Sequence, residues 1–214
     1  MYKRQEVIVM HDSNAYRTTG VDENIVNMTY KEVRRLDAGS WYSDEYKGEK
    51  VPGLREVLEL AQGKIKLNIE LKPADNGEEL ARKTVALIEK YNMENDCVIT
   101  SFSSSALLAA KSCDENIRVG YILSAAYGDY YDMKNIDFFS VNAAFLSKRT
   151  IDAIHNSGKQ VYAWTVNNKD SIKNLTNKGV DGVITDNPVL ARETIYSRDT
   201  SETIVNMIRY VFNQ

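Results

Sequence analysis

The sequence predicts an α/β fold of the (β/α) barrel type with a parallel sheet. Two observations carry this prediction. After residue 64, short apolar runs alternate with helical patterns, which is typical of consecutive βα units. The chain has 214 residues, of which 43% are hydrophobic and 27% charged, an ordinary composition for one globular domain with a sizeable core.

Six apolar runs are the expected strands of this sheet: Ile65–Leu71, Val98–Phe102, Val119–Leu123, Phe138–Val141, Val161–Val166 and Gly182–Thr185. Between and after them lie the expected helices, at about Gly77–Tyr91, Ser103–Lys111, Lys148–His155, Lys169–Lys178 and Pro188–Tyr196. Asn187 supports the last helix, because asparagine is a favoured N-cap and the proline that follows it suits the first helical position.

The first 64 residues and the last 16 have a different character. Val7–Met10 reads as an apolar strand, and residues 13–50 are polar, rich in aromatic residues and not periodic, as expected of a functional loop or a small inserted subdomain. A short helix is expected at Leu54–Gln62. We therefore expect a partial barrel over residues 1–198, with an insertion at about 13–50, and an amphipathic helix over 199–214. The apolar stripe of that helix is Ile204, Met207, Ile208, Val211 and Phe212.

The number of strands is too small for a closed barrel. A (β/α)₈ barrel takes about 250 residues, and here a long insertion uses part of a 214-residue chain. Six strands would leave two sheet edges open. Since a strand begins only a few residues after Met1, we expect that the first two strands of the barrel are missing from the sequence.

Charge and composition exclude several classes of function. The net charge of −3 arises from 27 basic and 30 acidic residues spread along the chain. The sequence therefore has no concentration of basic residues of the kind that binds nucleic acid. No apolar run approaches the roughly 20 residues of a membrane span, and the start lacks a signal peptide's apolar core. Cys97 and Cys113 lack zinc-site spacing and are expected to be reduced thiols. We expect a soluble chain as given, with a small-molecule substrate and an undetermined compartment.

The run Leu67–Lys72 is the most informative strand. Alternation places Asn68, Glu70 and Lys72 on one face, which in a barrel points inward, at the strand end where barrel enzymes keep their active sites. A carboxylate there can hold Ca²⁺ or Mg²⁺, and a lysine can reach an anionic oxygen. The alternative is a Glu70–Lys72 ion pair that only stabilises the strand.

One histidine and one tryptophan also end apolar strands. His11 is followed by Asp12, which could orient the ring for acid–base chemistry, although a strand-end histidine can also be structural. Trp164 could form an apolar wall for the carbon skeleton of a substrate, or simply fill the core. His155 is expected to be structural, because it lies in the last turn of a helix, where a cation suits the dipole.

Six motifs in order, from about residue 7 to residue 195, resemble the glycerophosphodiester phosphodiesterase family. They are Val7–Asp12 with Arg17–Gly20, then Leu36–Trp41, Gly48–Pro52, Leu67–Lys72, Val161–Asn167 and Gly182–Pro188. The tail at Tyr196–Thr203 resembles that of family members from Gram-positive bacteria with an N-terminal membrane domain. The sequence does not decide whether such a domain, and with it membrane attachment, belongs to the native protein.

The resemblance implies a TIM-type barrel with a small insertion after the His-Asp motif. It implies hydrolysis of glycerophosphodiesters, such as glycerophosphocholine, to glycerol 3-phosphate and an alcohol, with two histidines as acid and base and a divalent metal, Ca²⁺ or Mg²⁺. In this reading His11 is the second histidine, Glu70 a metal ligand and Lys72 a phosphate contact, and Trp164 packs against the glycerol.

The sequence departs from the family pattern at its start. The family's His-Arg-Gly and Glu-x-Asp motifs do not occur upstream of Val7. Glu70 would then be one carboxylate of three and His11 one histidine of two, so we expect the chain alone to be inactive.

Two alternatives stay open beside a phosphodiesterase seen without its N-terminal part. One is a non-catalytic remnant or interaction module, whose barrel is completed by another chain or a swapped copy. The other is an unrelated phosphate-binding barrel enzyme. Finding the two missing motifs in frame upstream of Met1 would favour the enzyme.

Overall fold

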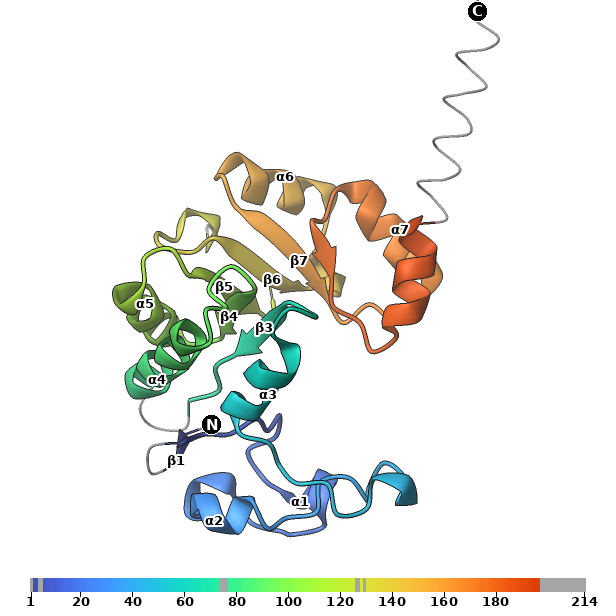
Figure 1. The fold of residues 1–214 in the computed structure, drawn as a ribbon. Coiled ribbons are helices and arrows are strands. Elements are labelled where there is room, and N and C mark those ends of the chain that lie inside the picture. The colour runs from blue at the N-terminus through green and yellow to red at the C-terminus, as the bar shows by residue number, and fades with distance from the viewer. Residues whose placement is uncertain (1, 4–5, 74–76, 126–127, 129, 197–214) are drawn as a thin grey trace, which may run out of the picture. The chain divides into compact units, whose positions relative to one another are not determined.

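The computed structural model describes residues 2–3, 6–73, 77–125, 128 and 130–196. The chain divides into two compact units, residues 1–121 and 122–214, and the boundary falls within strand β5, Arg118–Leu123. Figure 1 shows the elements of both units. The amphipathic helix expected at 199–214 lies outside the described residues.

The first unit begins with a short hairpin. Strands β1, Tyr2–Lys3, and β2, Glu6–Val7, pair antiparallel. Beyond β2 the chain stays extended, since Ile8 bridges to Gly53 and the Val9 amide donates to the carbonyl of residue 52 over 2.9 Å. The strand predicted at Val7–Met10 is therefore shorter than predicted, because residues 52 and 53 offer only a brief partner before a helix begins.

Residues 13–50 pack around a small apolar cluster, to which Ile8 and Val51 also belong. They form four short helices: α1, Tyr16–Thr19; η1, Ile25–Asn27; α2, Tyr30–Val33; and η2, Asp44–Tyr46. The buried cluster beneath them consists of Ile8, Ala15, Ile25, Met28, Val33, Leu36 and Val51. The apolar residues of this stretch are too widely spaced to show a period, and they meet only when the short helices fold back on one another.

A loop at the end of this stretch is fixed by one carboxylate. Asp37 accepts hydrogen bonds from the main-chain amides of Gly39, Ser40 and Gly48 and from the Ser40 hydroxyl. These four bonds lower the pKa of Asp37 far below its usual range, with the Ser40 amide making the largest contribution. The loop carries Trp41, which is about half exposed.

The rest of the first unit is a parallel sheet with its helices. Strands β3, Leu67–Glu70, β4, Cys97–Ser101, and β5 pair parallel in that order. The helices are α3, Leu54–Ala61; α4, Gly77–Lys90; and α5, Ser104–Cys113, and α4 and α5 pack against each other. Four of the five residues of β4 are buried, and Ile99 is fully buried, as expected of a parallel strand that is covered on both faces.

The second unit repeats the same pattern. Strands β6, Phe138–Asn142, β7, Gln160–Trp164, and β8, Gly182–Val183, pair parallel in that order. The short helix η3, Tyr130–Asp132, precedes β6, and between the strands lie η4, Ala143–Phe145; α6, Lys148–Asn156; and α7, Lys169–Lys178. A further helix covers residues 188–196 and begins as predicted, with the Asn187 side chain accepting from the Leu190 amide.

Parallel strands that alternate with helices confirm the predicted fold class, an α/β fold with the elements of a TIM-type barrel. The clearest difference concerns Ile65, where the first of the six apolar runs was expected to start as a strand. The Ile65 amide donates to the Ala61 carbonyl, and its side chain is 66% exposed, so the residue belongs to the turn that closes α3.

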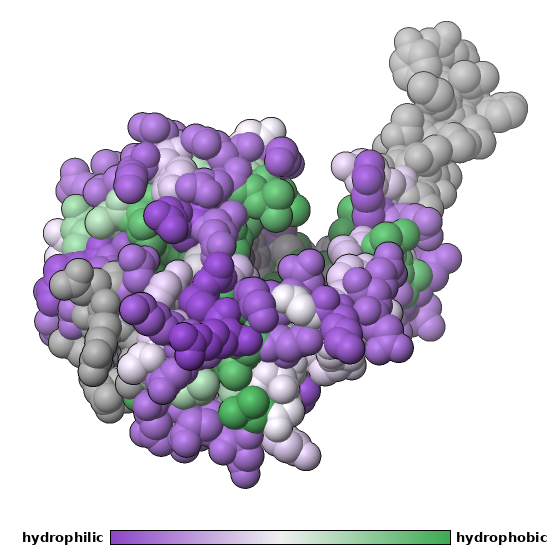
Figure 2. All heavy atoms as spheres, turned by 60° about the horizontal axis from the view of Figure 1, so that its bottom comes forward, coloured by the Kyte–Doolittle hydropathy of each residue, from purple (hydrophilic) through white to green (hydrophobic). Residues whose placement is uncertain are grey.

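The surface shows no broad apolar area on the face drawn in Figure 2, where hydrophilic residues predominate and hydrophobic ones form separate small areas. Among the described residues, no helix combines the length and the apolar character needed to cross a bilayer.

Candidate functional site

A pocket of about 260 Å³ lies in the first unit. Most of its wall is apolar and comes from residues 7–10, α3, β3 and α4. Three residues with ionisable side chains also line it, namely His11, Glu70 and Lys72. The three candidate residues that the sequence indicates in this unit therefore share one cavity, although His11 lies 61 positions before Lys72 in the chain.

Strand β3 positions two of these residues. The Leu67 amide donates to the carbonyl of residue 96, just before β4, and the Leu71 amide donates to the carbonyl of residue 100 in β4, each over 2.7 Å. Their polar neighbours Asn68 and Glu70 therefore direct their main-chain groups away from β4. The Glu70 carboxylate lies 3.6 Å from the Lys72 ammonium, and both side chains are about 30% exposed. The Glu70–Lys72 ion pair that the sequence offers as an alternative is thus present at the end of β3.

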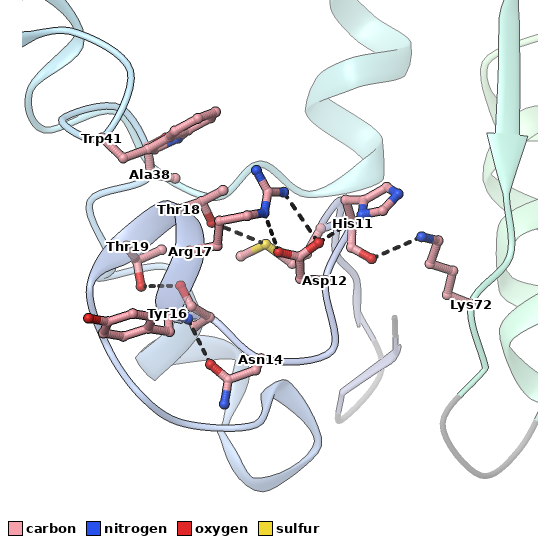
Figure 3. A network of polar contacts seen from close by, with 12 residues as sticks. His11, Asp12, Asn14, Tyr16, Arg17, Thr18, Thr19, Ala38, Trp41 and Lys72 are labelled. Carbon is pink, nitrogen blue, oxygen red and sulfur yellow. Dashed lines mark hydrogen bonds and ion pairs between the residues drawn. The ribbon is translucent and has the colours of Figure 1, made fainter. Parts of the chain in front are cut away.

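His11 belongs to a chain of contacts that Figure 3 shows from close by. Its Nδ1 lies 2.8 Å from Oδ1 of Asp12. Arg17, on α1, donates from Nε to the other carboxylate oxygen of Asp12 over 2.5 Å and from Nη2 to Oδ1 over 3.2 Å. The guanidinium carbon of Arg17 also lies 5.5 Å from the ring centroid of Trp41. The motif at residues 17–20 is therefore connected to the His-Asp motif through one carboxylate.

The charge state of Asp12 follows from these contacts. The hydrogen bond from Arg17, and then that from His11, lower the pKa of Asp12 from 3.8 to about 2. The same contact raises the pKa of Arg17. Asp12 is therefore a carboxylate at neutral pH, and its negative charge lies directly beside the imidazole of His11.

Lys72 also contacts His11. Its Nζ donates to the main-chain carbonyl of His11 over 3.0 Å, as Figure 3 shows. An ammonium group has three donors, so the bond to His11 and the nearby Glu70 carboxylate leave donor capacity for a third acceptor. The structure thus gives Lys72 a main-chain contact that the sequence did not indicate.

Trp164 lies in the second unit, at the end of β7. Its Nε1 donates to the Ser140 carbonyl over 2.9 Å, and the side chain is partly buried. This bond fixes the indole, and both sequence interpretations, a substrate wall and a core filler, are compatible with it. His155, in the same unit, contacts Asp181 through Nε2 over 2.9 Å, in keeping with the structural role expected for it.

Two further residues of the first unit carry functional interest that the sequence did not reveal. Arg17 was visible only as part of a motif, and its contact with Asp12 depends on the turn between them. Thr84 lines the pocket, is fully buried, and its hydroxyl has no hydrogen-bond partner among the described residues. It follows the apolar stripe of α4, so the sequence pattern assigns it to the core.

A divalent cation does not fit the described residues by themselves. Ca²⁺ takes six to eight oxygen ligands, and Mg²⁺ requires octahedral geometry. Within the part of the chain that the structure describes, no three His, Cys, Asp or Glu side chains come together in a way that could hold a metal ion. Glu70 is one carboxylate, and the ammonium of Lys72 lies beside it.

Comparison with protein families gives a match to the model described as the Glycerophosphoryl diester phosphodiesterase family, over residues 3–190. Among curated proteins, a glycerophosphodiester phosphodiesterase of Caldanaerobacter subterraneus is 27% identical over 97% of this chain and 82% of its own length. Another, from Bacillus subtilis, is 28% identical over 89% of this chain and 72% of its own length.

Comparison with solved structures gives the same family of folds. A phosphodiesterase from Oleispira antarctica, solved with the product sn-glycerol-3-phosphate, superposes with a TM-score of 0.77 at 29% identity, covering 89% of this chain and 80% of its own. A glycerophosphodiester phosphodiesterase from Agrobacterium tumefaciens has a TM-score of 0.72 at 24% identity, covering 89% and 83%, and supports the fold.

Proposed function

Since this chain belongs to the glycerophosphoryl diester phosphodiesterase family, we propose that its pocket is a site for glycerophosphodiesters, which the family hydrolyses to glycerol 3-phosphate and an alcohol. The observation that carries the proposal is the convergence of His11, Glu70 and Lys72 on one cavity. The Oleispira relative supports it, since its structure holds sn-glycerol-3-phosphate as the product. On the same ground we propose a role for the protein in lipid and glycerol metabolism.

His11 is the proposed acid–base residue. Hydrolysis of a phosphodiester requires a base that takes a proton from the attacking oxygen and an acid that gives one to the leaving oxygen. His11 lines the pocket, its side chain is mostly exposed, and its Nδ1 lies beside the Asp12 carboxylate. One histidine can serve one of these two steps at a time.

Lys72 is the proposed phosphate contact. Lys72 lines the pocket, and its ammonium has donor capacity beyond its hydrogen bond to His11 and its ion pair with Glu70. A cation at this position lowers the energy of a bound phosphodiester anion and directs it toward the imidazole.

Trp164 is the proposed contact of the glycerol skeleton. The proposal is supported by the hydrogen bond to Ser140, which holds the indole in one orientation.

Glu70 is the proposed carboxylate for a divalent cation, Ca²⁺ or Mg²⁺. Because the described residues do not form a cation site by themselves, we assign no step of the reaction to a metal here. We further propose that the 214-residue chain alone does not turn over a glycerophosphodiester.

A second candidate function, an interaction module completed by another chain, is favoured by the edge position of β3. Among the described residues β3 pairs with β4, and its other edge carries main-chain groups of Asn68 and Glu70. Such an edge can accept a further strand. Light scattering of the purified chain separates the candidates: a dimer that Asn68→Pro dissociates would favour the module, and a monomer would disfavour a swapped copy.

Binding of the product tests the site without requiring turnover. We would titrate sn-glycerol 3-phosphate into the ¹⁵N-labelled chain and follow the amides of residues 10–12 and 70–72. We expect saturable chemical-shift changes at these positions. Lys72→Met should weaken the affinity at least several-fold. Lys148→Met, a change at an exposed lysine of α6, should leave the affinity unchanged. If no shifts appear, or if Lys72→Met binds with unchanged affinity, the support for a phosphate site is removed.

A further inference from the structure

The two histidines of the sequence face aspartates through opposite ring nitrogens. Nδ1 of His11 lies 2.8 Å from Oδ1 of Asp12, whereas Nε2 of His155 lies 2.9 Å from Oδ2 of Asp181. A neutral imidazole has one N–H and one lone pair, and the nitrogen that faces a carboxylate carries the proton. The two rings should therefore adopt opposite tautomers within one protein.

This difference matters for His11, because the tautomer decides which nitrogen can take a proton. With Nδ1 protonated toward Asp12, the lone pair of His11 is on Nε2. His11 lines the pocket and its side chain is 74% exposed, so Nε2 is the ring nitrogen left for a bound hydroxyl or water. The main-chain carbonyl of His11 is held separately by Lys72, which fixes the backbone from which the ring projects.

The orientation of Asp12 depends on Arg17. Asp12 is the next residue after His11, and without other contacts its short side chain could rotate away from the ring. Arg17 binds both carboxylate oxygens, at 2.5 and 3.2 Å, which fixes the plane of the carboxylate as well as its position. The guanidinium is itself covered on one side by the Trp41 ring.

We infer that Arg17 is a positioning residue, which holds Asp12 so that it accepts the Nδ1–H of His11 and leaves Nε2 as the proton-accepting atom. The use of Nε2 in catalysis depends on the function proposed above. The tautomer itself does not, because it follows from contacts present without substrate.

The experiment uses the full 214-residue chain labelled with ¹⁵N-histidine. Long-range ¹H–¹⁵N spectra at about pH 8.5, above the ordinary imidazole pKa of about 6.5, identify the protonated nitrogen of each neutral ring. We expect the Nδ1–H tautomer for His11 and the Nε2–H tautomer for His155. Arg17→Gln should convert His11 to mainly the Nε2–H form, which isolated imidazoles prefer, and should leave His155 unchanged.

Two further variants make the result specific. Asp12→Asn should remove the preference of His11 as completely as Arg17→Gln does. Arg192→Gln is the matched control, since that guanidinium lies 5.7 Å from the Tyr196 ring centroid in the second unit and should affect neither histidine. Amide spectra of each variant confirm the fold, and little change is expected because the Arg17 side chain is 54% exposed.

The inference is overturned if His11 of the unmodified chain is mainly Nε2–H, or if Arg17→Gln leaves its tautomer unchanged. It is also overturned if Arg192→Gln changes His11 as much as Arg17→Gln does. Failure of sn-glycerol 3-phosphate to bind would instead count against the proposed function and would leave the tautomer result standing.

Discussion

Nζ of Lys72 donates a 3.0 Å hydrogen bond to the main-chain carbonyl of His11, 61 positions earlier in the chain. The same ammonium lies 3.6 Å from the Glu70 carboxylate. Lys72 therefore connects the end of β3 to the histidine that a sequence pattern alone leaves isolated. A change at this lysine should alter the surroundings of His11 even when no substrate is bound.

Replacing Lys72 with methionine tests this connection. The change keeps most of the side-chain volume and removes the donor, so the free energy of unfolding should fall by about 1 kcal/mol, a typical value for one hydrogen bond. Amide hydrogen exchange at residues 10–12 should become faster. Lys148→Met removes only an exposed pair with Asp152 on α6 and should cost less. Equal effects of the two variants on exchange at 10–12 would show that Lys72 does not hold this segment.

The low pKa of Asp12 predicts how stability depends on pH. Because folding lowers this pKa from 3.8 to about 2, the contacts of Asp12 stabilise the protein fully above about pH 4 and lose that contribution as the pH falls to about 2. Arg17→Gln removes the largest cause of the shift. The difference in unfolding free energy between the unmodified chain and Arg17→Gln, measured in urea, should therefore shrink between these pH values. A difference that is independent of pH would contradict this assignment.

The loop around Asp37 should be sensitive to the loss of its carboxylate. Asp37→Asn replaces an oxygen that accepts hydrogen bonds with an amide group that donates them, so part of the network with Gly39, Ser40 and Gly48 must break. The thermal midpoint should fall by more than it does for Asp44→Asn, a change at an exposed carboxylate in the same stretch. Comparable midpoints for the two variants would mean that the network adds little to stability.

Gly39 should not tolerate a side chain. A Cβ atom there would lie 1.9 Å from the Tyr46 carbonyl oxygen, a main-chain atom that cannot move without distorting the loop. Gly39→Ala should therefore cost at least about 1–3 kcal/mol, as overpacking usually does. Gly53→Ala is the control, since the nearest atoms to its Cβ would be 3.5 Å away. Urea denaturation of both variants checks the prediction, which equal losses of stability would refute.

The sequence predicted the elements from β4 to the helix at 188–196 well, because helical and strand periods are local. It failed where a partner or a turn decides the structure. Val7–Met10 was expected to be one strand, but its pairing depends on residues 52–53. Ile65 looked like part of a strand, but its amide closes the turn after α3.

The candidate site was predictable to a similar degree. His11, Glu70 and Lys72 each follow or end an apolar strand, and strand ends of a parallel barrel gather on one side. The link from Arg17 to Asp12 was not predictable, because it requires the turn that brings α1 back to the His-Asp motif. The buried hydroxyl of Thr84 was not predictable either, because Thr84 falls on the apolar face of α4 and therefore looks like an ordinary core position.

The most direct test is release of glycerol 3-phosphate from glycerophosphocholine by the 214-residue chain, assayed with Ca²⁺ or Mg²⁺ and with each replaced by a chelator. With Glu70 as one carboxylate beside Lys72, and His11 as one histidine, we predict no release above the buffer rate. Release that the chelator stops and that Glu70→Ala abolishes would contradict this prediction and show that the chain assembles a complete metal-dependent site.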